Sequence, residues 1–347
     1  YKYNSKGDVE SVTDQSGRVK SYSYDVMHRV TTSTDASGAV TKFVYDKNGN
    51  LSSLITPTGA VTKYTYNAID QVTSEADPMG MLSEYTYDPV GNLTTITQTG
   101  GRVTSYTYDK AGNVMSEKNA KGYVKSYTYD AVYNVISETD YKGNKVKYAY
   151  DNNGNLTSVS DRLNNSTVFK YDALNNQTSV VDPESRKTAY AYDELSRLVS
   201  VTEADSIVSE YQYDAVGNLT YAAGYTYTDD LAGNVTSAKD ALGNVTEYVY
   251  NKNGMLQTVK NANGTRVDYD YDELDRIVKK AYDESTVALY TYDSDGNRIS
   301  MDDIAGVTGY EYDKNGRITA VKLSNGKSKI SYEYDVYGNI TKLTYPD

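Results

Sequence analysis

The stretch YDKNGNLSSLITPTGAVTKYTY, from Tyr45 to Tyr66, contains one full period of the chain and decides its fold. A Tyr-Asp pair opens the period, and a turn with Gly follows it. A short apolar segment, a second turn with Gly and a β-branched run then lead to the next Tyr-x-Tyr. The same pattern returns every 21 residues from Tyr3 to Tyr213 without an insertion. Self-similarity at a fixed spacing indicates a repeat architecture in which each repeat packs on its neighbours.

The phase of the repeat slips once. Sixteen residues separate Tyr213 from Asp229, after which steps of 21, 21, 21, 20 and 22 lead through Tyr250 to Tyr334 and make 17 repeats in all. We therefore expect one array over residues 1–347. Residues 1–213 keep strict phase, residues 214–250 form a shortened irregular repeat, and residues 251–347 are regular to slightly irregular.

Two aromatic columns run through the array. Two residues before each anchor tyrosine, such as Tyr45, stands another Tyr or Phe, and the two columns together hold 33 of the 41 aromatic residues. A spacing of two places both rings on one face of an extended strand. Cross-strand packing in such a ladder is worth a few tenths to about 1 kcal/mol per pair. We interpret the columns as structural.

The residue after the anchor is Asp or Asn in all 17 repeats, and Gly follows three residues later in 11 of them. Asp and Asn side chains stabilise tight turns through neighbouring backbone groups, and Gly accepts a positive φ. The other six residues in the Gly column are His28, Asp70, Tyr133, Asn175, Ser196 and Asp275. Asn, Asp and His are enriched at positive φ, so the column predicts that conformation, with Tyr133 and Ser196 fitting less well.

These columns define the residues that we expect to anchor the repeats. They include Tyr24, Asp25, Tyr45, Asp46, Gly49, Tyr87, Asp88, Gly91, Tyr108, Asp109, Gly112, Tyr129, Asp130, Tyr150, Asp151, Gly154, Tyr213, Asp214 and Gly217.

Each repeat reads as two short antiparallel strands joined by two turns, the second of them as at Asp35 to Gly38. Helical periodicity is absent. The sequence therefore predicts an all-β fold of antiparallel hairpin repeats of about 21 residues. About 34 strands at ~4.8 Å would extend a flat sheet to roughly 160 Å, so we expect it to wind into a β-spiral, hollow shell or solenoid.

Composition excludes several function classes. The chain has no Cys and one His, and its formal net charge is -12 with dispersed basic residues. No nucleic-acid partner is therefore expected. No apolar run is long enough for a membrane span. Asp46 to Asn50, DKNGN, is similar to the start of a calcium loop, but the remaining ligand spacing fails. We expect no catalytic residue, no metal site and no cofactor.

The repeated string resembles the YD repeat of the Rhs and YD-repeat family, which includes teneurins and insecticidal toxin-complex subunits. The resemblance extends over the whole chain. It implies a hollow β-shell that frequently encloses a C-terminal toxin. It also implies a secreted or surface-exposed bacterial protein. The closing region at which that family cleaves itself is not recognisable here.

We therefore expect a non-enzymatic shell or scaffold segment whose partner is an enclosed or C-terminal effector domain. Two alternatives stay open. One is a cell-surface adhesion module that binds glycans or a partner protein, and the other is a filament-forming β-solenoid. The tyrosines outside the two columns are the candidates for binding, above all Tyr123, Tyr141, Tyr221 and Tyr225.

Overall fold

A computed structural model of the chain describes residues 1–283, 286–324 and 329–346, and the remaining positions of the expected array lie outside these ranges. Within these ranges the regular structure consists of strands and turns. The described residues contain no helix of the length and apolar character needed to cross a membrane.

The strands are short, and most have five or six residues. Their bounds are β1 Lys2–Tyr3, β2 Val9–Thr13, β3 Val19–Tyr24, β4 Val30–Thr34, β5 Val40–Tyr45, β6 Leu51–Ile55, β7 Val61–Tyr66, β8 Val72–Ala76, β9 Leu82–Tyr87, β10 Leu93–Gln98, β11 Arg102–Tyr108, β12 Val114–Lys118, β13 Val124–Tyr129, β14 Val135–Thr139, β15 Lys145–Tyr150, β16 Leu156–Ser160, β17 Ser166–Tyr171, β18 Gln177–Val181, β19 Lys187–Tyr192, β20 Leu198–Thr202, β21 Val208–Tyr213, β22 Leu219–Ala222, β23 Tyr225–Asp229, β24 Val235–Lys239, β25 Val245–Tyr250, β26 Leu256–Lys260, β27 Arg266–Tyr271, β28 Ile277–Tyr282, β29 Thr286–Tyr292, β30 Arg298–Asp303, β31 Gly306–Tyr312, β32 Ile318–Lys322, β33 Lys329–Tyr334 and β34 Ile340–Thr344.

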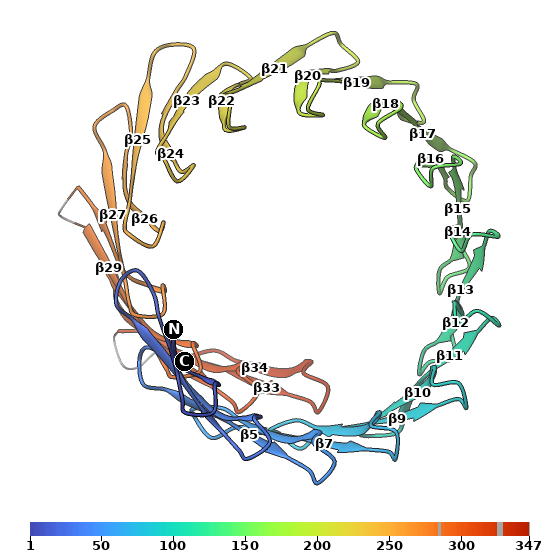
Figure 1. Ribbon diagram of the computed structural model, residues 1–347, viewed down its shortest axis with the longest axis vertical. Helices are drawn as coiled ribbons and strands as arrows, with labels where there is room; N and C mark the ends of the chain where they lie inside the picture. The colour runs from blue at the N-terminus through green and yellow to red at the C-terminus, as the bar shows by residue number, and fades with distance from the viewer. Residues whose placement is uncertain (284–285, 325–328, 347) are drawn as a thin grey trace. The chain divides into compact units, whose positions relative to one another are not determined.

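Strands that follow one another in the sequence pair antiparallel, as β5 does with β6 and β6 with β7, in a 34-stranded sheet. The predicted all-β fold of hairpin repeats is confirmed. The contacts divide the chain into two compact units. Unit 1 comprises Tyr1–Glu84, Gln98–Gly100 and Thr246–Asp347, and unit 2 comprises Tyr85–Thr97 and Gly101–Val245. In unit 1 the first and last parts of the chain (blue and orange to red in Figure 1) lie side by side.

The two aromatic columns lie on one face of the sheet, as their spacing predicts. In β5, Phe43 and Tyr45 are half-buried, whereas their neighbours Lys42 and Val44 are exposed. The register shifts between Val44 and Tyr45, so the strand bulges just before the anchor. The same shift precedes the other anchors, for example Tyr108. A bulge of this kind increases the local twist and aims the following side chain.

The hydroxyl groups of the anchor tyrosines donate a hydrogen bond to the backbone. The aromatic column two residues earlier, in which Phe can replace Tyr, does not depend on such a bond. The Tyr45 hydroxyl donates to the Val30 carbonyl oxygen at 2.8 Å, and the Tyr66 hydroxyl donates to the Leu51 carbonyl oxygen at 2.8 Å. The accepting residue stands six positions after the previous anchor, and it is apolar in these repeats except where it is Gln177 or Arg298. Equivalent bonds are made by Tyr24, Tyr108, Tyr129, Tyr150, Tyr171, Tyr192, Tyr213, Tyr271, Tyr292, Tyr312 and Tyr334. Each bond ties one repeat to the next, and this explains why both Phe residues stand in the other column.

Replacing Tyr108 by Phe is expected to destabilise the protein by about 1 kcal/mol, because the Leu93 carbonyl oxygen loses its 2.7 Å partner. The matched control is Tyr106→Phe, in the column where Phe43 and Phe169 occur naturally. Urea unfolding followed by tyrosine fluorescence measures both variants. Equal losses in the two variants would contradict a separate role for the anchor hydroxyl.

The sheet has almost no apolar core. Among the described residues the buried apolar side chains are Ala60, Ala281 and Ala320, and no large side chain is fully buried. Stability must therefore come from backbone pairing and from the aromatic columns, repeated along the chain.

Each anchor is followed by a five-residue turn, here called the anchor turn, for example Asp46–Asn50. The Gly49 amide donates to the Asp46 carbonyl, and Oδ1 of Asp46 accepts from the amides of Asn48 and Asn50 at 2.9 Å each. The fourth residue of the turn has a positive φ. All six non-glycine residues of this column have φ between 59° and 70°, so that prediction is confirmed, Tyr133 and Ser196 included.

Five of these six residues are linked to the turn before them, among them Asp275, which accepts from Asn253 at 3.4 Å. His28 Nδ1 lies 2.6 Å from Asp8 Oδ1, and Asp70 Oδ1 accepts from Asn50 Nδ2 at 2.6 Å. In unit 2, Asn175 and Ser196 accept from Asn155 and Asn176 at 2.8 and 3.0 Å. A left-handed conformation costs a residue other than Gly about 1–2 kcal/mol. The bonds between neighbouring turns offset part of that cost.

Replacing Tyr133 by Gly is expected to stabilise the protein by up to about 1 kcal/mol. The change removes the left-handed penalty of a φ of 70° and adds the smaller entropic cost of Gly in the unfolded chain. The Tyr133 side chain is 60% exposed, so little packing is lost. Thermal unfolding checks the change. The control, Asn175→Gly, also loses its bond with Asn155 and should gain less; a larger gain there would contradict the argument.

The 16-residue step has a local cause. Its second turn has only Ala223 and Gly224 between β22 and β23, with φ values of 47° and 94°, and Ala222 pairs directly with Tyr225. Positive φ at both central residues is typical of a two-residue type I′ hairpin. The five-residue turn found in most other repeats is therefore replaced here by a two-residue turn, and β22 and β23 are each one residue shorter than their equivalents, so that the repeat loses five residues.

Candidate functional site

The two turns of each repeat lie at opposite ends of its strands, and so they line opposite edges of the sheet. The anchor turns, such as Asp46–Asn50, form one edge. The second turns, here called return turns, form the other edge, as at Thr56–Ala60, where the Gly59 amide donates to the Thr56 carbonyl oxygen. In unit 1 these two edges meet, because return turns between residues 14 and 100 contact anchor turns between residues 251 and 338. We call this contact the seam.

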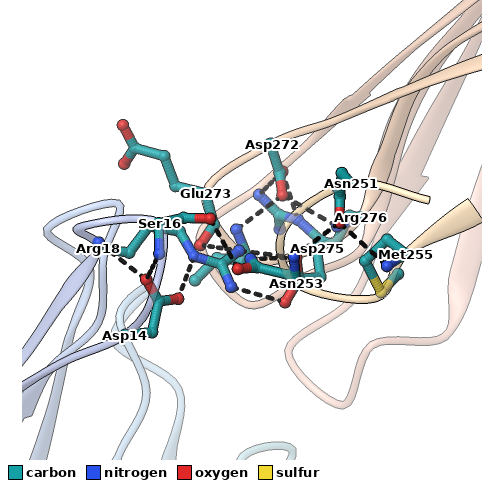
Figure 2. A network of polar contacts seen from close by, with 11 residues as sticks. Asp14, Ser16, Arg18, Asn251, Asn253, Met255, Asp272, Glu273, Asp275 and Arg276 are labelled. Atoms are coloured by element: carbon teal, nitrogen blue, oxygen red, sulfur yellow. Dashed lines mark hydrogen bonds and ion pairs between the residues drawn. The ribbon is translucent and has the colours of Figure 1, made fainter. Parts of the chain in front are cut away.

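Arg18 forms the charged part of the seam (Figure 2). Its Nη1 and Nη2 donate to the two carboxylate oxygens of Asp275 at 2.7 and 2.9 Å, and Nη1 also donates to the Glu273 carbonyl at 3.1 Å. Its Nε donates to Asp14 within its own return turn at 2.5 Å. The guanidinium lowers the pKa of Asp275. Paired bonds from a guanidinium to one carboxylate fix direction as well as distance.

Hydrogen bonds that involve no second ion pair extend the seam in both directions along the edge. The Ser16 hydroxyl donates to Asn253 Oδ1 at 2.6 Å. Asp295 accepts from the Thr56 hydroxyl at 2.9 Å, from the Thr58 amide at 3.2 Å and from the Thr58 hydroxyl. Asn315 Nδ2 donates to Asp77 Oδ2 at 2.6 Å.

Tyr337 closes the described part of the seam. Its hydroxyl donates to the Thr99 carbonyl at 2.5 Å. A Cβ added to Gly100 would lie 2.2 Å from that hydroxyl oxygen, so the contact requires Gly at this position. Tyr337 lies outside both aromatic columns, and the structure gives it a role between turns.

Apart from the contacts of Arg18, whose partner Asp275 is 257 residues away, the partners across the seam have a nearly constant sequence offset. The partners Ser16 and Asn253 are 237 residues apart, and both Asn315 with Asp77 and Tyr337 with Thr99 are 238 apart. At each of these contacts the anchor turn uses its third residue. The interface between the return turns and the anchor turns is not fully packed, because a cavity of 990 Å³ lies beside Thr58, Pro78 and Asp295. The seam therefore consists of discrete polar bridges rather than a packed core.

The single imidazole and the turn carboxylates have structural partners. His28 is exposed and pairs with Asp8, whose pKa is lowered first by the Asn4 amide and then by His28. The turn carboxylates accept backbone amides, as Asp46 does. Among the described residues no group of three His, Cys, Asp or Glu side chains is arranged to hold a metal ion. In these contacts the side chains hold turns in place.

The four tyrosines expected to bind a partner all lie in unit 2, in two groups. Tyr123 is exposed and is the fifth residue of a return turn, in which its amide donates to Asn119. Tyr141 donates its hydroxyl to Glu117, a bond that raises its pKa to about 12. Tyr221 and Tyr225 lie on the paired strands β22 and β23, and Tyr225 stacks on Tyr227 with ring centres 6.4 Å apart. The structure does not bring all four into one site.

Apart from Tyr337, which as a tyrosine outside the two columns was a candidate for binding, the seam residues were not among the expected site residues. Ser16, Arg18 and Asp295 occupy ordinary turn positions, and polar residues also stand at the third position of turns away from the seam, as Asn48 and Asn153 do. No local signal marks them. Only the sequence offset at which the chain meets itself selects them, and that offset comes from the three-dimensional path.

Comparison with known families agrees with the repeat assignment. The RHS Repeat family model matches residues 3–40, 45–86, 87–124, 108–140, 129–166, 171–208 and 192–229. The chain belongs to the RHS repeat family. The Teneurin YD-shell model matches residues 220–344 of this RHS-repeat chain, which include the shortened repeat and the later half of the seam.

Individual relatives match only part of the RHS-repeat chain. The tRNA3(Ser)-specific nuclease WapA of Bacillus spizizenii and the tRNA nuclease WapA of Bacillus subtilis strain 168 are each 31% identical over 134 residues. That region is 38% of this chain and 6% of either relative. The crystal structure of TcdB2-TccC3 matches with a TM-score of 0.73 and 13% identity, covering 100% of this chain and 24% of that one. A form without its hypervariable C-terminal region gives 0.72. These structures share the fold.

Proposed function

We propose that this RHS-repeat chain is a non-enzymatic wall segment of a secreted or surface-exposed bacterial protein, and that it encloses or displays an effector domain. The seam is the observation that carries the proposal. Return turns bind side chains on anchor turns some 238 residues away in successive repeats. Contacts of this kind hold two distant stretches of the sheet edge to edge, as a continuous wall requires.

The proposal also draws on the relatives. The names of the WapA proteins describe tRNA nucleases, and this chain matches a small fraction of their length. The shared segment is made of repeats without a catalytic cluster among its described residues. We therefore assign the nuclease activity of those relatives to parts that this chain does not match, and a supporting role to the repeats.

Protection of an attached domain tests enclosure. A small protease-sensitive reporter is fused behind residue 347 and digested beside the same reporter in free form. Enclosure predicts slower cleavage of the fused reporter, and a destabilised seam variant should restore fast cleavage. Equal cleavage rates for the fused and the free reporter would contradict enclosure, and display of the effector domain would be the remaining role.

Catalysis is tested separately. The purified chain, incubated with tRNA and divalent cations, is expected to leave the tRNA intact, whereas a relative with its nuclease domain serves as positive control. Cleavage that follows the chain through purification would overturn the non-enzymatic assignment.

A further inference from the structure

The third position of the anchor turn is the contact position of the seam. In residues 251–338 of unit 1 it is occupied by Asn253, Asp295, Asn315 and Tyr337, and each of these side chains bonds to a return turn. Leu274, the remaining member in this stretch, is half-buried beside Arg18. The position therefore faces the docked edge along the whole described seam.

Anchor turns outside the seam often carry an exposed apolar side chain at the same position, as Met27 and Ile69 do in unit 1 and Val90 does in unit 2. Four more such residues lie in unit 2. Val132, Leu174, Leu195 and Val216 stand there, with exposures of 73%, 67%, 72% and 84%. Leu174, Leu195 and Val216 belong to consecutive repeats, so they recur about every 10 Å along one edge. Scattered surface leucines need no explanation, but apolar residues recurring at a known contact position indicate an interface. We call these four residues the anchor row.

The return edge of unit 2 carries a matching set. In the seam, return turns make contact through their first residue, as Thr56 and Asp77 do, their third, as Ser16 and Thr58 do, or their fifth, as Arg18 does. The first residue is polar in the return turns of unit 2, so the third and fifth positions are compared here. At these positions unit 2 has Leu163 and Leu242 in third place and Tyr123 and Ile207 in fifth place, all exposed. We call these four residues the return row. Both partners of a seam-like contact are thus present in unit 2, in apolar form.

We propose that the anchor row is a docking surface for return turns, and that a second copy of this chain supplies them through its return row. The contact has the edge-to-edge geometry of the seam, with apolar burial replacing the polar bridges. The contact joins an anchor row to a return row. An assembly of any size therefore has one free anchor row at one end and one free return row at the other. Such head-to-tail contacts build open-ended assemblies unless rotation closes them into a ring. The proposal does not depend on enclosure of an effector.

Sedimentation velocity of the intact chain over a broad concentration range tests this. The wild-type protein is expected to form dimers and then larger species as concentration rises. The anchor-row variant Leu174→Asp, Leu195→Asp, Val216→Asp should weaken association at least about tenfold, because charged residues would have to be desolvated in the contact. Leu231→Asp is the control: Leu231 is fully exposed in an anchor turn but stands in second place. It should associate like wild type.

A mixing experiment separates docking from nonspecific stickiness. The return-row variant Leu163→Asp, Leu242→Asp should also fail to associate alone. Mixed with the anchor-row variant, it should form heterodimers that grow no further. The pair docks through its two intact rows, one from each variant, and the two rows that stay free both carry the Asp substitutions. Circular dichroism checks that both variants keep the β-fold. A wild-type chain that stays monomeric, association that survives the anchor-row variant, or a mixture without heterodimers would each overturn the proposal.

Discussion

Acidification below pH 3.8, the ordinary pKa of an Asp side chain, is expected to unfold the protein steeply. Asp109 shows why. Its Oδ2 accepts from Asn113 Nδ2 at 2.9 Å, and its Oδ1 accepts from the amides of Ala111 and Asn113 at 2.8 and 2.9 Å. The Asn113 side chain, followed by these amides, lowers the pKa of Asp109 below 3.8. Lowered pKa values also occur at Asp14, Asp25, Asp46, Asp88, Asp130, Asp140, Asp151, Asp161, Asp172, Asp182, Asp193, Asp214, Asp230, Asp240, Asp272 and Asp313.

The sign follows from linkage. A carboxyl group whose folded-state pKa is depressed contributes its stabilisation above the unfolded-state pKa and loses it as pH falls through the folded value. Each of these turns contains one such group, so unfolding takes up many protons and the stability falls steeply with pH. Near-UV circular dichroism of the tyrosines, recorded during acid titration at fixed urea, measures the midpoint and the steepness.

Asn substitution provides the control. Asn67 shows that Asn can serve the same turn, since its Oδ1 accepts from the amides of Ile69 and Gln71 at 3.0 Å each. The variant Asp109→Asn, Asp151→Asn, Asp230→Asn keeps this acceptor and removes three titrating groups. Its stability should depend less on pH. The same pH dependence in the variant and the wild type would show that the turn carboxylates do not govern acid unfolding.

The substitution Arg18→Glu is expected to open the charged end of the seam, at a cost of about 1–3 kcal/mol to unit 1. It removes both bonds to Asp275 and places a third carboxylate beside Asp14 and Asp275. The Arg18 side chain is only 20% exposed, which limits screening, but Asp275 at 37% keeps the value toward the lower end. Hydrogen exchange of backbone amides in residues 14–18 and 251–276 should speed up.

Arg186 is the matched control, because it holds the same place in a return turn of unit 2 and pairs through Nε with Asp182 at 2.6 Å. Arg186→Glu loses that local pair, as Arg18→Glu loses its own. The difference between the two variants measures the seam. If both cost the same and exchange near residue 275 is unchanged, the contact between Arg18 and Asp275 does not stabilise unit 1.

Local structure could be predicted from the sequence because the same residue pattern recurs in every repeat. The Asp46 turn, the positive φ at His28 and the pairing of β5 with β6 depend on contacts inside one repeat or between neighbours, and the 21-residue period displays these. The different tasks of the two aromatic columns were also within reach, since Phe43 and Phe169 both stand in the column before the anchor. That distinction was missed.

The seam could not be predicted in the same way. Which return turn meets Asp295 depends on the rotation that each repeat adds, and small changes in twist and bulge accumulate over many strands. No single residue encodes this sum. The pairing of Arg18 with Asp275 can therefore be recognised only when the three-dimensional path of the chain is known. Both residues can be read from the sequence, but their contact cannot.

The uniform separation across the seam restricts how this chain can change its length. Deleting one period between the two docked stretches would shift the anchor turns by one repeat relative to the return turns. Thr58 would then face Asn315 in place of Asp295, and Asp77 would lose Asn315 as its donor. All the bridges would lose their present partners at once. Duplications and losses, the ordinary means by which tandem arrays evolve, should therefore be tolerated outside that interval and selected against within it.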